Sequence, residues 1–160
     1  PLMQAKKNLK NYPVSFIQSD GFLAIKDSYD LAIIAGMGAY LISDIMKHAK
    51  QDQATYILQA NDKHDYLRNE LMHLGFTIIN EYIVHDHFYY VIIECRKGKM
   101  KLSDEDLILG PILKTKPEAI PYYQRKLKHI DSFLSKVDQK RHDELNQVYK
   151  IYKDFLNVIQ

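Results

Sequence analysis

The sequence predicts an α/β fold, in which a mostly parallel sheet ends in an antiparallel hairpin and is followed by a pair of helices. Apolar strand-like runs alternate with helical patterns up to residue 75, as they do in βαβ units. Two β-rich runs at 76–84 and 88–95 are then separated by only three residues, which is the spacing of a hairpin. From residue 123 onward, apolar residues recur in steps of three and four, which is typical of packed helices.

The first 75 residues alternate between the two periodicities. Residues 1–12 carry a proline at a helix start and apolar residues at helical spacing, and residues 14–18 alternate as a strand. The run 31–35 has no polar residue, as expected of a strand covered on both faces. A helix, a short strand at 56–59 and a second helix follow. The polar pair Asn61-Asp62 can cap the second of these helices, and Gly75 ends it.

The remaining chain predicts a link and a helical hairpin. Ser103 followed by acids is a helix start, and Gly110-Pro111 is a break. The helical phase changes between residues 137 and 145, so we expect an antiparallel coiled-coil hairpin that turns at 138–143. The chain therefore divides into a predicted α/β domain at 1–115, which the resemblance described below makes a partial Rossmann-like domain, and the helical hairpin at 116–160.

Composition excludes few functions. The 160 residues have a net charge of only +2, so any surface for nucleic acid must be local. A single cysteine, Cys95, excludes an internal disulfide and fits a reducing cytoplasm, and no apolar run is long enough to span a membrane. His85 and His87 have the spacing of metal ligands, but without a third ligand we expect no metal. The sequence does not determine the oligomeric state; we expect a monomer.

The end of the 31–35 strand is the expected ligand site. Gly36 and Gly38 remove side chains where the strand ends, so the backbone can turn and a ligand can approach closely. In open α/β sheets, ligands bind outside the carboxyl ends of the strands. No Ser-His-Asp or Cys-His arrangement accompanies the glycines, so the sequence assigns no catalytic nucleophile or general base.

Five ordered motifs resemble the TrmK family, the bacterial tRNA methyltransferases that act on N1 of adenine at tRNA position 22. The motifs are Asp20-Gly21, the stretch 34–38, the stretch 58–61, the stretch 100–103 and the stretch 109–113. Two departures are Ala39 where the family has a second glycine pair and Ala60 where it has proline. A parallel sheet that ends in a hairpin is also similar to the class I methyltransferases that use S-adenosylmethionine.

The resemblance implies a Rossmann-like class I methyltransferase sheet that lacks its first strands. The family's first strand, its acidic glycine turn and the strand whose acid holds the ribose have no counterpart here. We therefore expect a truncated chain that binds S-adenosylmethionine weakly or not at all. Tight, saturable binding in calorimetry would refute this expectation.

The resemblance also implies site residues. The expected cofactor contacts are Asp20, Gly21, Gly36, Met37 and Gly38, although Asp20 could simply form a turn. Gln59 and Asn61 could read the edge of the target adenine, because amides both donate and accept. For Asn61 the role of a helix cap remains open.

A run of cations without an intervening acid is the expected contact with tRNA phosphates. It comprises Arg96, Lys97, Lys99 and Lys101, and further cations at 114, 116, 125, 126 and 128 continue it into the helical hairpin. An ordinary solvated face is the alternative. Two other functions stay open, namely a non-catalytic RNA- or protein-binding module with a coiled-coil arm, and a small-molecule methyltransferase.

Overall fold

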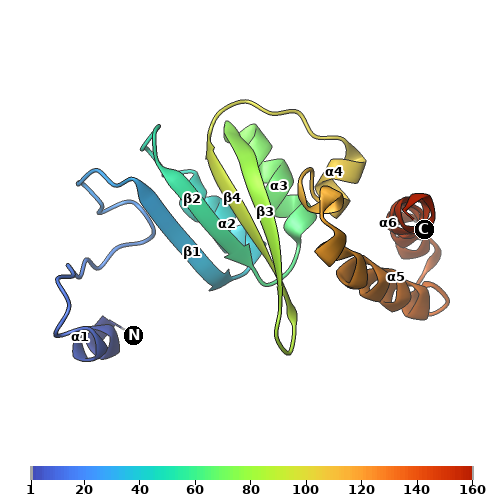
Figure 1. The fold of residues 1–160 in the computed structure, drawn as a ribbon, viewed down its shortest axis with the longest axis horizontal. Helices are drawn as coiled ribbons and strands as arrows, with labels where there is room; N and C mark the ends of the chain where they lie inside the picture. Colours follow the sequence, from blue (N-terminus) through green and yellow to red (C-terminus); the bar gives the residue numbers. More distant parts are fainter. Residues whose placement is uncertain (1, 160) are drawn as a thin grey trace.

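The structure of the protein is a computed structural model, and it describes residues 2–159. Figure 1 shows a sheet with α2 and α3 behind it, the N-terminal helix α1 beyond one edge and helices α4 to α6 beyond the other. The elements are α1 (Leu2–Asn8), β1 (Leu31–Met37), α2 (Ala39–Met46), β2 (Thr55–Ala60), α3 (His64–His73), β3 (Phe76–His85), β4 (Tyr89–Lys97), α4 (Asp104–Leu109), α5 (Ile120–Leu134) and α6 (Gln139–Val158), with short 3-10 turns at Leu113–Thr115 and Pro117–Ala119.

The sheet has the predicted mixed topology. Its strand order is β1-β2-β4-β3, with β1 and β2 parallel and β4 antiparallel to both of its neighbours. The hairpin prediction is confirmed, because β3 and β4 pair up to His85 and Tyr89 around a three-residue loop. The second strand of the hairpin therefore lies inside the sheet, and its first strand forms the edge.

One face of the sheet is buried and the other is largely open. Tyr56, Leu58 and Cys95 have no exposed surface and pack in the same core as Ile42 and Met46 of α2. Burial raises the pKa of the Cys95 thiol to about 12, so this thiol stays protonated. Large apolar side chains remain exposed on the opposite face, among them Leu31, Ile33, Tyr82 and Val84.

The predicted strand at 14–18 is wrong. Residues 9–30 contain no strand, and β1 pairs only with β2. A strand needs a neighbour for its backbone groups, and the structure offers residues 14–18 none. Residues 14–18 are extended without pairing, and local turns follow, in which the N–H of Leu23 donates to the Asp20 carbonyl and that of Ile25 to the Phe22 carbonyl.

A buried ion pair holds the segment between β4 and α5, residues 98–119, against the sheet, and we call this segment the link. Arg68 of α3 and Glu81 of β3 are almost wholly buried, with 2.8 Å between Arg68 Nε and Glu81 Oε1. The second carboxylate oxygen of Glu81 accepts the backbone N–H groups of Ile112 and Leu113, each at 2.9 Å. Arg68 Nη1 donates to the Leu107 carbonyl at 2.7 Å. Both charges of the pair are thereby compensated, as a buried charge requires.

The helix predicted after Ser103 is confirmed as α4. Ser103 caps it, accepting from the N–H of Asp106 while the Asp106 carboxylate accepts from the N–H of Ser103. Gly110 ends α4 with a φ of +94°, and an added Cβ there would lie 2.6 Å from Glu81 Oε2. The break predicted at Gly110-Pro111 is therefore also a place where the link passes close to the ion pair.

Helices α5 and α6 form the predicted hairpin, but its turn lies elsewhere. The predicted turn at 138–143 is wrong because α6 already begins at Gln139. Asp138 caps this helix by accepting the N–H of Arg141 at 2.9 Å, so the chain turns at 135–138. The hairpin packs around Tyr123 and Tyr152, and the hydroxyl of Tyr123 donates to the Leu109 carbonyl. None of the helices within residues 2–159 has the length and apolar character needed to cross a membrane.

Candidate functional site

The carboxyl ends of β1 and β2 form an open rim. Gly36 has a φ of +75°, and its N–H donates to Gln59 Oε1 at 2.8 Å, while the N–H of Asn61 donates to the Met37 carbonyl at 2.9 Å. A Cβ added at Gly36 or Gly38 would meet no atom within 4 Å. We call Gly36 to Gly38, together with Gln59 and Asn61, the glycine rim. It leaves space at the sheet edge where α/β folds bind ligands.

Gln59 fixes the rim through both ends of its amide. Its oxygen accepts from Gly36, and its nitrogen donates to the Ala60 carbonyl at 2.9 Å and to Asn61 Oδ1 at 3.4 Å. The helix-cap alternative for Asn61 is wrong, because α3 begins after Lys63, a residue with a φ of +50°. Gln59 is therefore engaged within the protein, and Asn61 is the amide with hydrogen-bonding capacity left.

The structure separates Asp20 and Gly21 from the glycine rim. An added Cβ at Gly21 would lie 2.9 Å from Cγ2 of Ile45, near the end of α2, whereas the rim precedes the first residue of this helix. The length of α2 puts about 10 Å between the two places. The expectation that Asp20 and the glycines share one cleft is corrected by this arrangement. Residues 14–18 form no strand, so no strand carries Asp20 to the carboxyl ends of β1 and β2.

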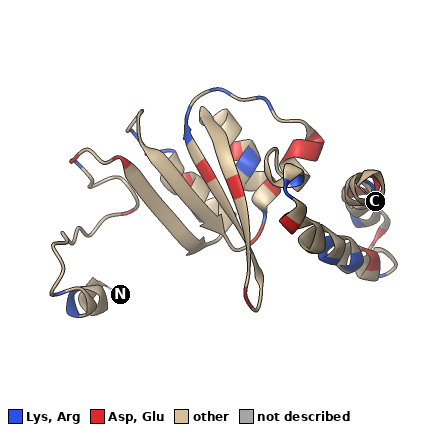
Figure 2. Ribbon diagram, in the orientation of Figure 1, with Lys and Arg blue, Asp and Glu red and all other residues tan. Residues whose placement is uncertain are grey.

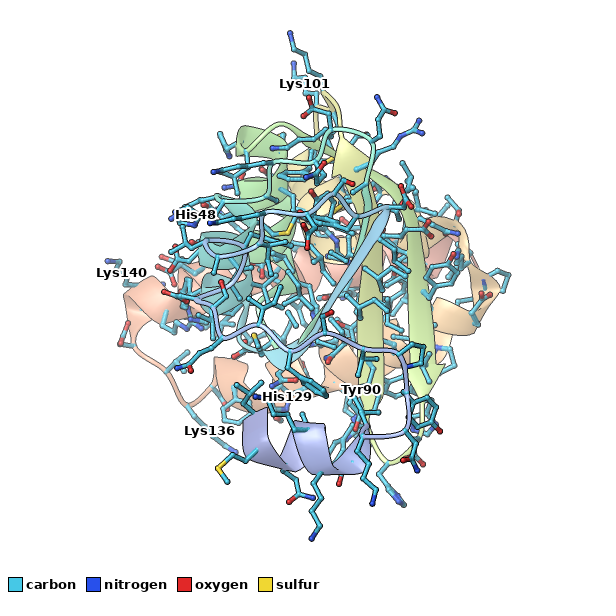
Figure 3. All side chains as sticks on the ribbon, turned by 90° about the vertical axis from the view of Figure 1, so that its left-hand side faces the viewer. His48, Tyr90, Lys101, His129, Lys136 and Lys140 are labelled. Carbon is cyan, nitrogen blue, oxygen red and sulfur yellow. The ribbon has the colours of Figure 1, made fainter. Side chains whose placement is uncertain are left out.

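The basic run after β4 also lies away from the rim. The register pairs Gln59 with Ile92 and Thr55 with Arg96, so β4 carries Arg96 toward the amino ends of β1 and β2. Figure 3 shows Lys101 at one end of the molecule and Tyr90 and His129 toward the other. Lys97, Lys99 and Lys101 follow Arg96, so this run cannot meet a base held at the rim. The contact of this run with tRNA phosphates, away from the target base, stays a prediction.

Two of the further cations are already engaged within the protein. Lys114 Nζ lies 2.6 Å from Glu105 and 2.9 Å from Asp106, and Lys116 Nζ donates to the Glu81 carbonyl and to Asn80. The cations at 125, 126 and 128 make no ion pair within the described residues. Figure 2 shows these basic positions along α5.

A cavity of about 750 Å³ adjoins the glycine rim, and we call it the rim pocket. It lies between the end of β2, the tip of the β3–β4 hairpin and α5. Tyr89 packs across it, with its ring 5.7 Å from that of Tyr122 and 5.9 Å from the guanidinium carbon of Arg125. The residues that line it are Gln59, Asn61, His64, Phe88, Tyr89, Tyr90, Tyr122, Arg125, Lys126, Lys128, His129 and Ser132.

The rim pocket is lined by positive charges, and two of its titratable side chains are partly buried. None of its described lining residues is acidic, and three are lysine or arginine. Burial, and to a smaller extent the nearby Arg68 charge, lower the pKa of His64 to about 4, so this imidazole is neutral at pH 7. Its Nε2 lies 3.1 Å from the Ala60 carbonyl. Burial also lowers the pKa of Lys126. The pocket therefore suits a ligand with an apolar part and a negative charge.

Several pocket residues were missed by sequence reasoning. On α5, positions 122, 125, 129 and 132 follow in steps of three, four and three, which places them on one helix face. Of these four positions the sequence analysis singled out only Arg125, as an expected phosphate contact, because the helical pattern was drawn from the apolar residues. Phe88 at the hairpin tip carried no signal that distinguishes a pocket wall from a turn. His85 stacks on Tyr89 at 4.3 Å, and no three His, Cys, Asp or Glu of residues 2–159 gather as metal ligands do.

Comparisons with known proteins agree with one another. The model of the family TrmK, tRNA (adenine(22)-N(1))-methyltransferase, matches residues 1–159. MG248 of Mycoplasma genitalium, described as a candidate tRNA methyltransferase, is 30% identical over 118 residues, which are 70% of this chain and 54% of that protein. The chain thus spans about half the length of this relative.

Solved structures give the same result. Sp1610 of Streptococcus pneumoniae, a candidate tRNA (m1A22) methyltransferase, is 28% identical with a TM-score of 0.86, over 98% of this chain and 77% of that one. Its complex with S-adenosyl-L-methionine matches at 27% identity and a TM-score of 0.81, over 96% and 75%. A protein of the NADB-Rossmann superfamily from Streptococcus agalactiae matches at 26% identity and a TM-score of 0.87, over 98% and 75%. The fold is therefore Rossmann-like, and the chain belongs to the TrmK family of tRNA (adenine(22)-N(1))-methyltransferases.

Proposed function

We propose that this chain forms the RNA-facing part of an enzyme that transfers a methyl group from S-adenosylmethionine to N1 of an adenine in tRNA. The observation that carries this proposal is the open glycine rim, which adjoins a pocket lined by cations and aromatic rings. Relatives described as tRNA methyltransferases support the substrate class. The complex of Sp1610 supports the methyl donor.

The reaction asks for positioning rather than for a base. N1 of neutral adenine presents a lone pair, so no proton has to leave before it attacks a methyl group. Bound S-adenosylmethionine supplies that group in electrophilic form. The protein must hold the base in line and accommodate the positive charge that develops on it. This agrees with a rim built from backbone and amide groups.

Asn61 is the residue we assign to the target base. Its Oδ1 faces Gln59 Nε2 at 3.4 Å and keeps a second lone pair, which can accept a hydrogen bond from the exocyclic amine of adenine. That contact would orient the neighbouring N1. Gln59 supports this contact without touching the base, because it holds Gly36 in its left-handed conformation and fixes the direction of the Asn61 side chain.

The described residues fit the methyl end of the cofactor better than its adenosine end. The open space at Gly36 and Gly38 can admit a sulfonium group, whereas Asp20 lies at the far end of α2. We therefore expect the chain alone to bind S-adenosylmethionine weakly. This favours a second candidate function, which is RNA binding without catalysis.

Labelled methyl transfer tests the proposal. The chain is incubated with S-adenosylmethionine at rising concentrations and with a bacterial tRNA transcript that carries adenine or guanine at position 22. We expect 1-methyladenosine only in the adenine transcript, and at least tenfold less with Asn61→Ala than with the control Asn69→Ala. Binding of tRNA without methylation at any donor concentration assigns the chain to the second candidate. Absence of both methylation and tRNA binding refutes the two functions together.

A further inference from the structure

We infer that the rim pocket holds an unpaired nucleotide that neighbours the target base in the RNA strand, with its base at the aromatic hairpin tip and its phosphate on α5. This inference rests on the proposed function and deepens it. The glycine rim alone could hold a base, but the rim pocket is a second space with its own walls. It assigns a role to Phe88, Tyr90 and the basic face of α5.

The side chains that line the rim pocket favour a nucleotide as its ligand. The wall holds aromatic rings at 88, 89, 90 and 122; the exposed rings at 88 and 90 offer faces for stacking, and every base has a π-face. Arg125, Lys126 and Lys128 face no carboxylate in the pocket, so they are available to a phosphate. The volume of about 750 Å³ lies within the range of small-ligand pockets, so a nucleotide can enter. An apolar ligand would not need three cations, and an inorganic anion would not need the rings.

The position of the pocket selects a nucleotide within a strand. Gln59 and Asn61 belong both to the glycine rim and to the pocket wall, so the two spaces share a border. N1 lies on the pairing edge of adenine, so the target must be unpaired or flipped out before it reaches the rim. A flipped base stays attached to its neighbour. That neighbour lies within one nucleotide of the rim, where the pocket is.

The exposed ring of Phe88 fits this role. Its side chain is 63% exposed at the loop between β3 and β4, although aromatic rings are usually buried. Tyr89, in contrast, packs between His85 and Tyr122 and so supports the tip. The exposed rings are therefore the ones available to a ligand, and the packed ring holds the tip in place.

Binding of a tRNA transcript to the full chain at several salt concentrations tests the inference. We expect Phe88→Ala/Tyr90→Ala to weaken binding by about fivefold to one hundredfold without changing the salt dependence, because the variant removes stacking and keeps every charge. Arg125→Gln/Lys128→Gln should lower the slope of log K against log salt by about one for each phosphate that is no longer neutralised. Phe88→Tyr/Tyr90→Phe keeps both rings and should bind as the unchanged protein does.

Two controls decide the outcome. Lys6→Gln/Lys7→Gln removes the same charge from the exposed faces of α1, beyond the opposite edge of the sheet, and should leave affinity within about twofold. Equal losses in this control, or undiminished binding by both pocket variants, would overturn the inference. Unfolding midpoints of all variants exclude loss of fold as the cause.

The same binding measurements also distinguish failure of this inference from failure of the proposed function. If the unchanged chain does not bind tRNA at all, the proposed function fails as well. If it binds tRNA but the pocket variants bind equally, only the pocket assignment fails. Titration with free adenosine monophosphate completes the test: binding as tight as that of tRNA assigns the pocket to a free nucleotide and overturns the strand assignment.

Discussion

The two flanks of the sheet are held by different forces. Beside β3, the buried pair Arg68 and Glu81 holds the link to the helical hairpin through charge-assisted hydrogen bonds. Beside β1, the N-terminal segment rests on aromatic contacts, with Phe22 stacked on Tyr29 at 5.5 Å and set edge-on to Tyr56 at 5.9 Å. Directional hydrogen bonds fix the position of the β3 flank. The β1 flank is held by packed rings, and no strand pairs with its edge.

Removal of one charge from the β3 flank should have the largest effect. Glu81→Leu leaves the Arg68 guanidinium buried without its counter-ion, which costs about 3–5 kcal/mol of stability. Urea unfolding measures this loss. The matched control Asp44→Leu breaks an exposed pair with Lys47 and should leave the urea midpoint nearly unchanged, because solvent screens such a pair. Equal costs would mean that the buried pair is not what holds this flank.

Gly110→Ala should destabilise the same flank through a steric clash. An added Cβ would lie 2.6 Å from Glu81 Oε2 and 2.7 Å from Arg68 Nη2, at a φ of +94°. Backbone strain costs about 1–3 kcal/mol, and displacement of the ion pair adds to it. Gly75→Ala is the control for strain alone, because Gly75 has a φ of +75° and open space around it. Thermal unfolding of the two variants should separate the clash from the strain, and equal losses would exclude a clash.

Acid should weaken the side on which α5 packs. The pKa of His64 is lowered from 6.5 to about 4 in the folded chain. Between these values the unfolded chain binds a proton that the folded chain does not, so stability falls as pH drops through this window. The expected loss is about 2 kcal/mol between pH 7 and pH 5. Urea midpoints should be less dependent on pH in His64→Gln than in His48→Gln, which changes an exposed histidine. Parallel pH profiles would contradict the assignment.

The smallest expected effect on stability comes from comparing one residue on the open face of the sheet with one on the covered face. Ile33 of β1 is 66% exposed and Ile93 of β4 is 1% exposed. The substitution Ile93→Val should cost about 0.5–1.5 kcal/mol, and Ile33→Val should stay within about 0.5 kcal/mol. Guanidinium unfolding compares the two. A larger cost at Ile33 would show that β1 is covered in solution.

Local signals predicted most of the fold. The apolar run before Gly36, the hairpin spacing after residue 75 and the cap at Ser103 each fix a structure within a few residues. The strand at 14–18 failed because a strand depends on its neighbour, which the pattern of one segment does not reveal. The hairpin turn was misplaced because phase alone does not locate a cap such as Asp138.

The site was less predictable than the fold. That the glycines lie beside the amides at 59 and 61 was predictable, because these residues end two strands that pair in parallel. The distance of the basic run at 96–101 from the rim was not predictable from its sequence, because it depends on β4 running antiparallel to β2. The pocket wall joins a hairpin tip to a helix more than thirty residues later, and only tertiary packing brings the two together.

The buried thiol of Cys95 gives the molecule an internal reporter. This cysteine lies in β4 with no exposed surface, and its high pKa leaves almost no reactive thiolate at neutral pH. Maleimide or disulfide reagents can therefore reach it only when the central strands separate. The rate of modification therefore measures how often the sheet opens. A dye attached through Ser132→Cys would label the pocket, because the native thiol does not react while the sheet is closed.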